Sequence, residues 1–447
     1  MTEPLLYHST RGASYAATLS QAIAAGLAPD GGLYVPEAMP QLDPSAFDPH
    51  GTLAETAATL LAPFFAGDAL SSELPAICAE ALTFETPLRR LPHTDANVLE
   101  LFHGPTAAFK DVGARFLAAC LHRLPRNHAQ PLTILVATSG DTGAAVAAAF
   151  HRQPGVRVVI LYPDGLVSPR QAHQLGCFDD NVQALRVQGR FDDCQRMVKA
   201  ALNDTALQAR IPLSSANSIS LGRLLPQMSY YAHAALSWWR EHGTPLNVIV
   251  PTGNLGNALA CLWVREIGLP IGQLRLACNA NTTLPDFFAG NDYTPREAIA
   301  TLANAMDVGA PSNFERLRWT YPHSHELREQ LQATSVDDAS IRHTIARHAR
   351  EDGGSEGEVF CPHTATAMHV LDRLREAGDT SPWTIVATAH PAKFESVVEP
   401  LIGKPVAVPA ALASMLLRPA SAEPLEANDH ALREWLLQRV EEAMPVP

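Results

Sequence analysis

Short β-branched runs alternate with helical stretches from Pro131 almost to the end of the chain. The apolar run LTILVAT (132–138) leads into the small-residue stretch AAVAAAF (144–150). Further runs with the composition of buried strands follow at VRVVILY (156–162), VQALRV (182–187), LNVIV (246–250), LRLAC (274–278) and WTIVAT (383–388). Amphipathic stretches such as CQRMVKAAL separate most of these runs. Because a strand, a crossover helix and a second strand form a parallel unit, this pattern predicts an α/β protein with parallel sheets.

The segments outside this alternation predict a further domain at the N-terminus, an extension at the C-terminus and a loop. The first 85 or so residues are rich in Ala and Pro without a clear strand rhythm, which predicts a mostly helical N-terminal domain. Residues 404–424 predict an extended wrap before a terminal helix at 431–444, and the glycines of 351–358 predict a loop. We expect an N-terminal domain at 1–85 and a large α/β domain made of 86–130 and 221–400. A smaller α/β domain is expected at 131–220, and a C-terminal extension at 401–447.

The composition favours small-molecule chemistry. A chain of 447 residues with 47% hydrophobic composition can bury a large core. Its net charge of -13, from 33 basic and 46 acidic residues, supplies no basic stripe for nucleic acid or for an anionic membrane. The start of the chain lacks a signal-like pattern and no run of about 18 apolar residues occurs, so we expect a cytoplasmic protein without membrane contact.

Cysteine and lysine usage narrows the chemistry further. The seven cysteines form no C-x-x-C pair, so we expect reduced core thiols, no disulfide framework and no metal site. The chain contains only four lysines, Lys110, Lys199, Lys393 and Lys404, and chemistry that needs a primary amine therefore has few candidates.

Two predicted strands end in glycine-rich turns that open helices, a geometry that presents backbone N–H groups to an anion. In PTGNLGN, Gly253 and Gly256 permit close backbone approach, and a phosphate is the natural occupant. The spacing matches neither a nucleotide P-loop nor a dinucleotide turn, and a glycine turn that only ends a strand is the alternative. In SGDTG, Ser139, Asp141 and Thr142 point to a carboxylate or a cofactor hydroxyl, with plain helix capping as the alternative.

A third cluster, ELFHGPTAAFKDVGARF, delivers Lys110 to the start of a helix. A cation there opposes the helix dipole, which favours the neutral amine that a Schiff-base or proton-shuttling lysine needs. A solvated surface lysine is the alternative, and Lys393, which follows the polar turn TAHPA, is a candidate anion contact. An amine, a phosphate cradle and a polar turn at strand ends fit a cofactor with an aldehyde and a phosphate, namely pyridoxal phosphate.

Six motifs occur in the order and spacing of threonine synthases: HGPTAAFKD, ATSGDTGAA, PTGNLGN, SNFERLRW, PHTA and TAHPAKF. The N-terminal YHSTRGASY and the C-terminal Pro/Leu region also resemble that family, so the resemblance covers nearly the whole chain. It implies the fold type II architecture of pyridoxal-phosphate enzymes, with Lys110 as the Schiff-base lysine. It also implies the remaining cofactor contacts, at Asp141, Gly253, Asn254, Leu255, Gly256, Asn257 and Thr388.

The same resemblance implies a substrate and a reaction. O-phospho-L-homoserine and water would give L-threonine and phosphate, the work of a carbon–oxygen lyase in threonine biosynthesis. Lys110 would shuttle protons at Cα and Cβ. The substrate contacts that the resemblance implies are Thr138, Ser139, Gly140 and Thr142 near the carboxylate, and Arg223 at the phosphate.

Departures from the family pattern leave other outcomes open. The family usually has Asn where Ser220 stands, and an acidic N-x-N-D run where this chain reads NANTTLPDF. A phospholyase or hydroxy-amino-acid dehydratase that releases a 2-oxo acid and ammonia would use the same lysine. A non-catalytic binding protein on this fold is the alternative from another class. We expect a monomer or homodimer without strong activation by an effector such as S-adenosylmethionine.

Overall fold

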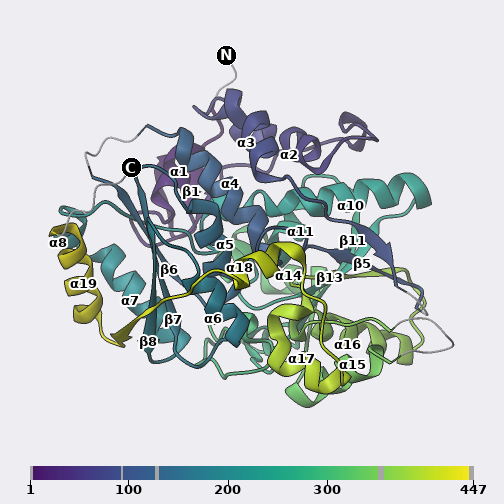
Figure 1. Cartoon of the computed structure of the whole chain (residues 1–447). Coiled ribbons are helices and arrows are strands. Elements are labelled where there is room, and N and C mark those ends of the chain that lie inside the picture. Colours follow the sequence, from purple (N-terminus) through teal and green to yellow (C-terminus); the bar gives the residue numbers. More distant parts are fainter. Residues whose placement is uncertain (1–3, 92–93, 126–129, 351–356, 442–447) are drawn as a thin grey trace.

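The computed structural model describes residues 4–91, 94–125, 130–350 and 357–441 (Figure 1). One sheet has the strand order β14-β8-β7-β6-β9, and all its pairs are parallel. Its strands are β6 (Leu132–Ala137), β7 (Val156–Pro163), β8 (Val182–Gln188), β9 (Leu213–Ser215) and β14 (Glu423–Glu426). The helices of this region are α5 (Asp141–Phe150), α6 (Pro169–Gly176), α7 (Phe191–Asn203), α8 (Thr205–Gln208) and α9 (Leu221–Leu224).

The larger sheet has the order β12-β11-β10-β13-β5-β4, in which only β4 runs antiparallel to its neighbour. Its strands are β4 (Leu88–Arg90), β5 (Ala96–Glu100), β10 (Leu246–Pro251), β11 (Ile271–Cys278), β12 (Leu331–Ser335) and β13 (Trp383–Ala387). The helices around it are α4 (Lys110–Arg123), α10 (Gln227–His242), α11 (Gly256–Glu266), α12 (Thr283–Phe288), α13 (Phe314–Thr320), α14 (Ser324–Gln330), α15 (Asp338–His348), α16 (Pro362–Glu376) and α17 (Glu395–Ile402).

Both sheets are covered on both faces. In the large sheet, Val248 packs into the cluster that includes residues of α4, α10 and α11, whereas its neighbour Ile249 packs with α15 and α16. In the five-stranded sheet, Ile134 joins the first of these clusters and Leu135 packs with α7 and α19 (Asp429–Glu441). Strands that are buried on both faces read as continuous apolar runs, which is why the sequence revealed them.

The predicted fold class is confirmed, and six strands lie where the sequence placed them, at β6, β7, β8, β10, β11 and β13. Strands β4, β9 and β14 escaped prediction because they have only three or four residues, and β12 escaped it because most of its residues are not buried. Their pairing partners, distant in sequence, decide their conformation. All seven cysteines are buried and none forms a disulfide, as expected.

The N-terminal region contains strands that the sequence analysis did not expect. Strands β1 (Tyr7–Ser9), β2 (Gly12–Ala17) and β3 (Tyr34–Pro36) form a small antiparallel sheet beside α1 (Leu19–Ala25), α2 (Leu53–Leu61) and α3 (Leu74–Ala81). The Tyr7 hydroxyl is buried and donates to the Phe64 carbonyl at 2.7 Å, which ties the sheet to the helices. Two of the strands have only three residues, too few for a period-two pattern to show.

The C-terminal segment crosses the front of the molecule in Figure 1 from α17 through α18 (Ala410–Leu416) to β14 and α19. The predicted wrap and terminal helix are confirmed, although the wrap also contains the short helix α18. Most of the predicted loop at 351–358 lies outside the described residues. The domain boundaries given above remain our proposal.

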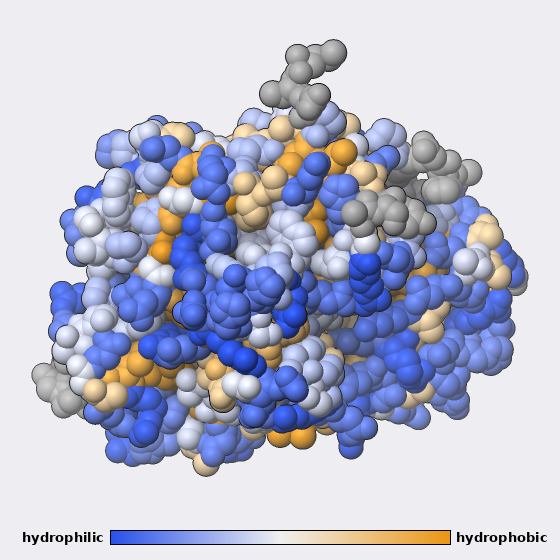
Figure 2. Space-filling model, turned by 180° about the vertical axis from the view of Figure 1, so that it is seen from behind, coloured by the Kyte–Doolittle hydropathy of each residue, from blue (hydrophilic) through white to orange (hydrophobic). Residues whose placement is uncertain are grey.

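The face in Figure 2 is mostly hydrophilic, with hydrophobic residues in separated groups. Within the described part of the chain, no helix has the length and apolarity needed to cross a membrane.

Candidate active site

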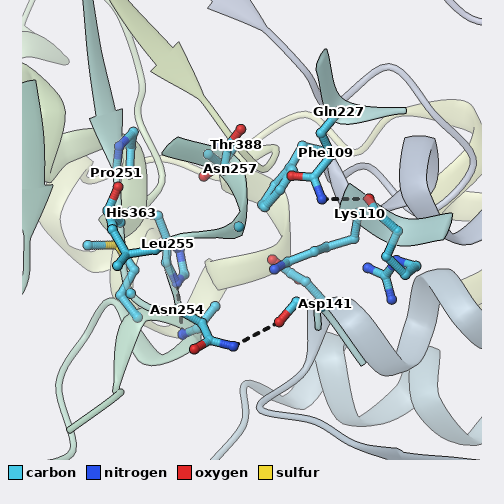
Figure 3. Close-up of a pocket in the computed structure, with 17 residues that line it drawn as sticks. Phe109, Lys110, Asp141, Gln227, Pro251, Asn254, Leu255, Asn257, His363 and Thr388 are labelled. Atoms are coloured by element: carbon cyan, nitrogen blue, oxygen red, sulfur yellow. Dashed lines mark hydrogen bonds between the residues drawn. The ribbon is translucent and has the colours of Figure 1, made fainter. Parts of the chain in front are cut away.

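A cavity lies where strands β10 and β13 end and helices α4, α5 and α11 begin (Figure 3). Ligands of parallel α/β sheets commonly bind at the carboxyl ends of strands. The lining residues come from segments far apart in the sequence: Phe109, Lys110, Asp141, Ser218, Arg223, Gln227, Pro251, Thr252, Gly253, Asn254, Leu255, Gly256, Asn257, Ala305, Met306, His363 and Thr388.

Lys110 is the first residue of α4, and a tight loop presents its amine to the cavity. The Phe109 N–H donates to the Thr388 carbonyl at 2.8 Å, and Ala107 adopts a positive φ of 56° just before it. The ammonium nitrogen lies 4.4 Å from the Phe109 ring centroid and has no hydrogen bond or ion pair among the described residues. Burial, with a smaller contribution from the nearby Arg223 charge, lowers the pKa of Lys110 to about 8, although Asp141 acts in the opposite direction.

This pKa predicts the pH at which Lys110 becomes reactive in the cofactor-free protein. An amine is nucleophilic when neutral, so labelling of Lys110 by acetic anhydride is expected to reach half its maximal rate near pH 8. An ordinary lysine has a pKa of about 10.4. Mass spectrometry of the labelled peptide measures the rate at each pH.

The Arg223→Gln variant checks the electrostatic part of this result. Because the Arg223 charge lowers the pKa of Lys110, its removal should move the labelling midpoint to higher pH. Arg186, half-exposed and outside the cavity lining, offers the matched control Arg186→Gln, which should leave the midpoint in place. A wild-type midpoint near pH 10 would contradict the assignment.

The turn after β10 forms a cradle of backbone groups. Leu255 adopts a positive φ of 64°, and α11 starts at the next residue with its N-terminal N–H groups toward the cavity. Gly253 is required by packing, since a Cβ there would lie 2.6 Å from the Met306 Cα. The Asn254 side chain holds the turn by donating to the Ser218 hydroxyl at 2.9 Å.

Two buried hydrogen-bond donors in the cavity lining lack partners among the described residues. They are Nδ2 of Asn257 and Nε of Arg223, whose side chain is 1% exposed. Burial lowers the pKa of Arg223 to about 10, so the guanidinium is still protonated at neutral pH. Buried donors are almost always satisfied, and these two therefore suit anionic groups that enter the cavity.

Lys393 forms a buried ion pair at the edge of the cavity. Its side chain is fully buried, its nitrogen lies 2.8 Å from Asp141 Oδ1, and it donates to the Thr106 carbonyl at 2.7 Å. Burial alone would raise the pKa of Asp141, but the Lys393 charge opposes this and the pKa is held below its usual value. The anion that Lys393 contacts is thus the Asp141 carboxylate of the SGDTG turn. Through Asp141 and the Thr106 carbonyl, Lys393 joins the start of α5 to the loop that carries Lys110.

Nine of the predicted site residues meet in the cavity, and four do not line it. The four are Thr138, Ser139, Gly140 and Thr142. The Thr138 hydroxyl accepts from the N–H groups of Gly140 and Gly143, each at 2.9 Å, and so shapes the turn. A direct role of these four residues in substrate binding stays a prediction.

His363 is one of several lining residues to which sequence reasoning assigned no role. It belongs to the PHTA motif, which was the available signal, and its Nε2 accepts from the Ala305 N–H at 3.0 Å. Burial is the main cause that lowers the pKa of His363 to about 4, so the ring is neutral at working pH. The others without a predicted role are Phe109, Ser218, Gln227, Pro251, Thr252, Ala305 and Met306.

The departures from the family pattern lie outside the cavity lining. Ser220 is buried, and its hydroxyl has no partner among the described residues. In NANTTLPDF, Asn279 donates to Asp307 at 2.7 Å and Asn281 accepts from the Ile299 N–H at 2.8 Å. These two asparagines therefore support the backbone around residues 299–307.

Three family models match the chain. "Pyridoxal-phosphate dependent enzyme" matches residues 80–391, "Threonine synthase N terminus" matches 6–82, and "Threonine synthase, C-terminal" matches 364–435. The threonine synthases of Haemophilus influenzae and Escherichia coli are each 37% identical to the chain, with 94% of the chain covered and 97% and 96% of the relative, respectively. The chain belongs to the threonine synthase family.

Solved threonine synthases share its fold. The structure from Escherichia coli superposes with a TM-score of 0.87 at 33% identity, covering 97% of this chain and 100% of that one. The pyridoxal-phosphate-bound structure from Brucella melitensis gives 0.85 at 34% identity, covering 97% and 99%. This member of the threonine synthase family is a pyridoxal-phosphate-dependent lyase, and the free amine, the glycine cradle and the unpartnered donors of its cavity fit that cofactor.

Proposed function

We propose that this enzyme converts O-phospho-L-homoserine and water to L-threonine and phosphate. One observation carries the proposal: a single cavity combines the Lys110 amine with two buried donors that have no partner among the described residues, Asn257 Nδ2 and Arg223 Nε. A cofactor with one phosphate and a substrate with a second one require two anion sites beside one amine. The family membership supports the same substrate.

The cofactor contacts that we propose are those that the family resemblance implies, and the residues concerned line this cavity. Lys110 would bind the aldehyde carbon, the turn from Gly253 to Asn257 the phosphate, and the Thr388 hydroxyl the ring nitrogen. Asp141 lines the cavity on the side of α5, where it would face the ring hydroxyl. When bound, pyridoxal phosphate supplies an electron sink for charge that develops on the substrate carbons.

The protein's own groups account for positioning and proton transfer. Arg223 would hold the substrate phosphate with its guanidinium fork, which orients the Cγ–O bond that breaks when phosphate leaves. The Lys110 amine would remove one proton from Cα and one from Cβ. After phosphate has left from Cγ and the hydroxyl of water has added at Cβ, it would return one proton to Cα and one to Cγ. A pKa of about 8 suits this shuttle near neutral pH, because both protonation states are then accessible.

Product analysis tests the proposal. The holoenzyme is incubated with O-phospho-L-homoserine, and phosphate, threonine and 2-oxobutyrate are measured together. We expect threonine and phosphate in equal amounts and no 2-oxobutyrate. Phosphate with 2-oxobutyrate and ammonia would instead establish a phospholyase, and an absence of phosphate release would reject this substrate.

A further inference from the structure

Two adjacent tyrosines of α10 converge on one atom of the phosphate cradle. The hydroxyl of Tyr230 lies 2.6 Å from Asn257 Oδ1, and that of Tyr231 lies 2.8 Å from the same oxygen. Neither tyrosine lines the cavity, whereas Asn257 does, so the two tyrosines contact the cavity only through Asn257.

Both hydroxyls are dependable donors. Each tyrosine is fully buried, and the two rings lie 4.7 Å apart between centroids, which restricts their motion. Burial raises the pKa of Tyr230 and of Tyr231 well above the usual range, so both hydroxyls keep their protons at working pH.

These two hydrogen bonds determine which end of the Asn257 amide faces the cavity. With Oδ1 occupied by two donors, the NH₂ group remains and has no protein partner among the described residues. If the amide turned round, the Tyr230 proton would have Gln227 Oε1 at 3.3 Å as its other acceptor. The structure shows no second acceptor for Tyr231 within the described residues, so the turned amide would leave a buried hydroxyl proton unsatisfied.

We propose that Tyr230 and Tyr231 are positioning residues that hold the Asn257 amide with its NH₂ toward the cofactor phosphate. This inference rests on the proposed cofactor contacts of the cradle. A turned amide would direct its carbonyl oxygen at the phosphate, where two partial negative charges repel, so the tyrosines convert a neutral side chain into an anion-selective contact.

The test compares Tyr230→Phe, Tyr231→Phe and the double variant as holoenzymes. We expect the dissociation constant for pyridoxal phosphate to rise about 3-fold in either single variant, since one tyrosine still orients the amide, and about 30-fold in the double variant. The ³¹P resonance of the bound cofactor should shift in the double variant, because the phosphate loses its amide donor.

Tyr7 offers a matched control. Its hydroxyl is equally buried and donates one hydrogen bond, to the Phe64 carbonyl, and Tyr7 belongs to the N-terminal sheet and does not line the cavity. Tyr7→Phe should lower thermal stability as a loss of one buried hydrogen bond does, but it should leave the cofactor affinity and the ³¹P resonance unchanged.

A double-mutant cycle with Asn257→Ala decides whether the tyrosines act through the amide. In that background the two tyrosine substitutions should no longer change the dissociation constant. A wild-type dissociation constant in the tyrosine double variant, or an effect that persists without Asn257, would overturn the inference. No substrate is added, so the result is independent of which product the enzyme makes.

Discussion

The Lys110→Ala variant is expected to form threonine at least about a thousand-fold more slowly than the wild type. It loses both the amine that binds the cofactor and the base that transfers protons at the substrate carbons, and general acid–base catalysis alone contributes about 100-fold to 10,000-fold. Steady-state threonine formation from O-phospho-L-homoserine measures the loss. The visible absorbance of the bound cofactor should change as well, because the covalent link to the protein is absent.

Lys199→Ala is the matched control for this experiment. Lys199 lies exposed in α7 and outside the cavity lining, so its removal should leave threonine formation within about two-fold of the wild type. If Lys110→Ala kept a tenth of the wild-type rate, the assignment of Lys110 as the reacting amine would be wrong.

The second large effect concerns stability. Lys393→Met removes one charge of a buried pair and leaves the Asp141 carboxylate without its cation. Breaking a buried ion pair from one side costs about 3–5 kcal/mol, so the free energy of unfolding should fall by that amount. Denaturant unfolding, followed by tryptophan fluorescence, measures the change.

Two further variants distinguish the effect of breaking the ion pair from the effect of losing any lysine. Lys404→Met removes an exposed charge and should change the free energy of unfolding by less than about 0.5 kcal/mol. In the double variant Lys393→Met with Asp141→Asn, both charges of this pair are absent, and much of the stability should return. Equal destabilisation in the single and double variants would show that the charge of Asp141 is not the cause.

The predictable parts of the site were those confined to a short stretch of chain. The PTGNLGN turn and the placement of Lys110 at a helix start depend on neighbouring residues, and both could be inferred from composition and spacing. The role of Lys393 was open at that stage. Its partners are the Thr106 carbonyl, 287 residues away, and Asp141 at the start of α5, and no local pattern encodes such a meeting.

The sequence by itself determined the α/β class and six buried strands, because a strand buried on both faces must be apolar at nearly every position. It also indicated the two glycine-rich turns that follow strands β6 and β10. Only the tertiary structure decided the antiparallel N-terminal sheet, the added strand β14 and the contact of Tyr230 and Tyr231 with Asn257. Short strands and buried side-chain donors take their partners from whichever distant segment the packing brings within about 3 Å, and that distance exists only in the folded chain.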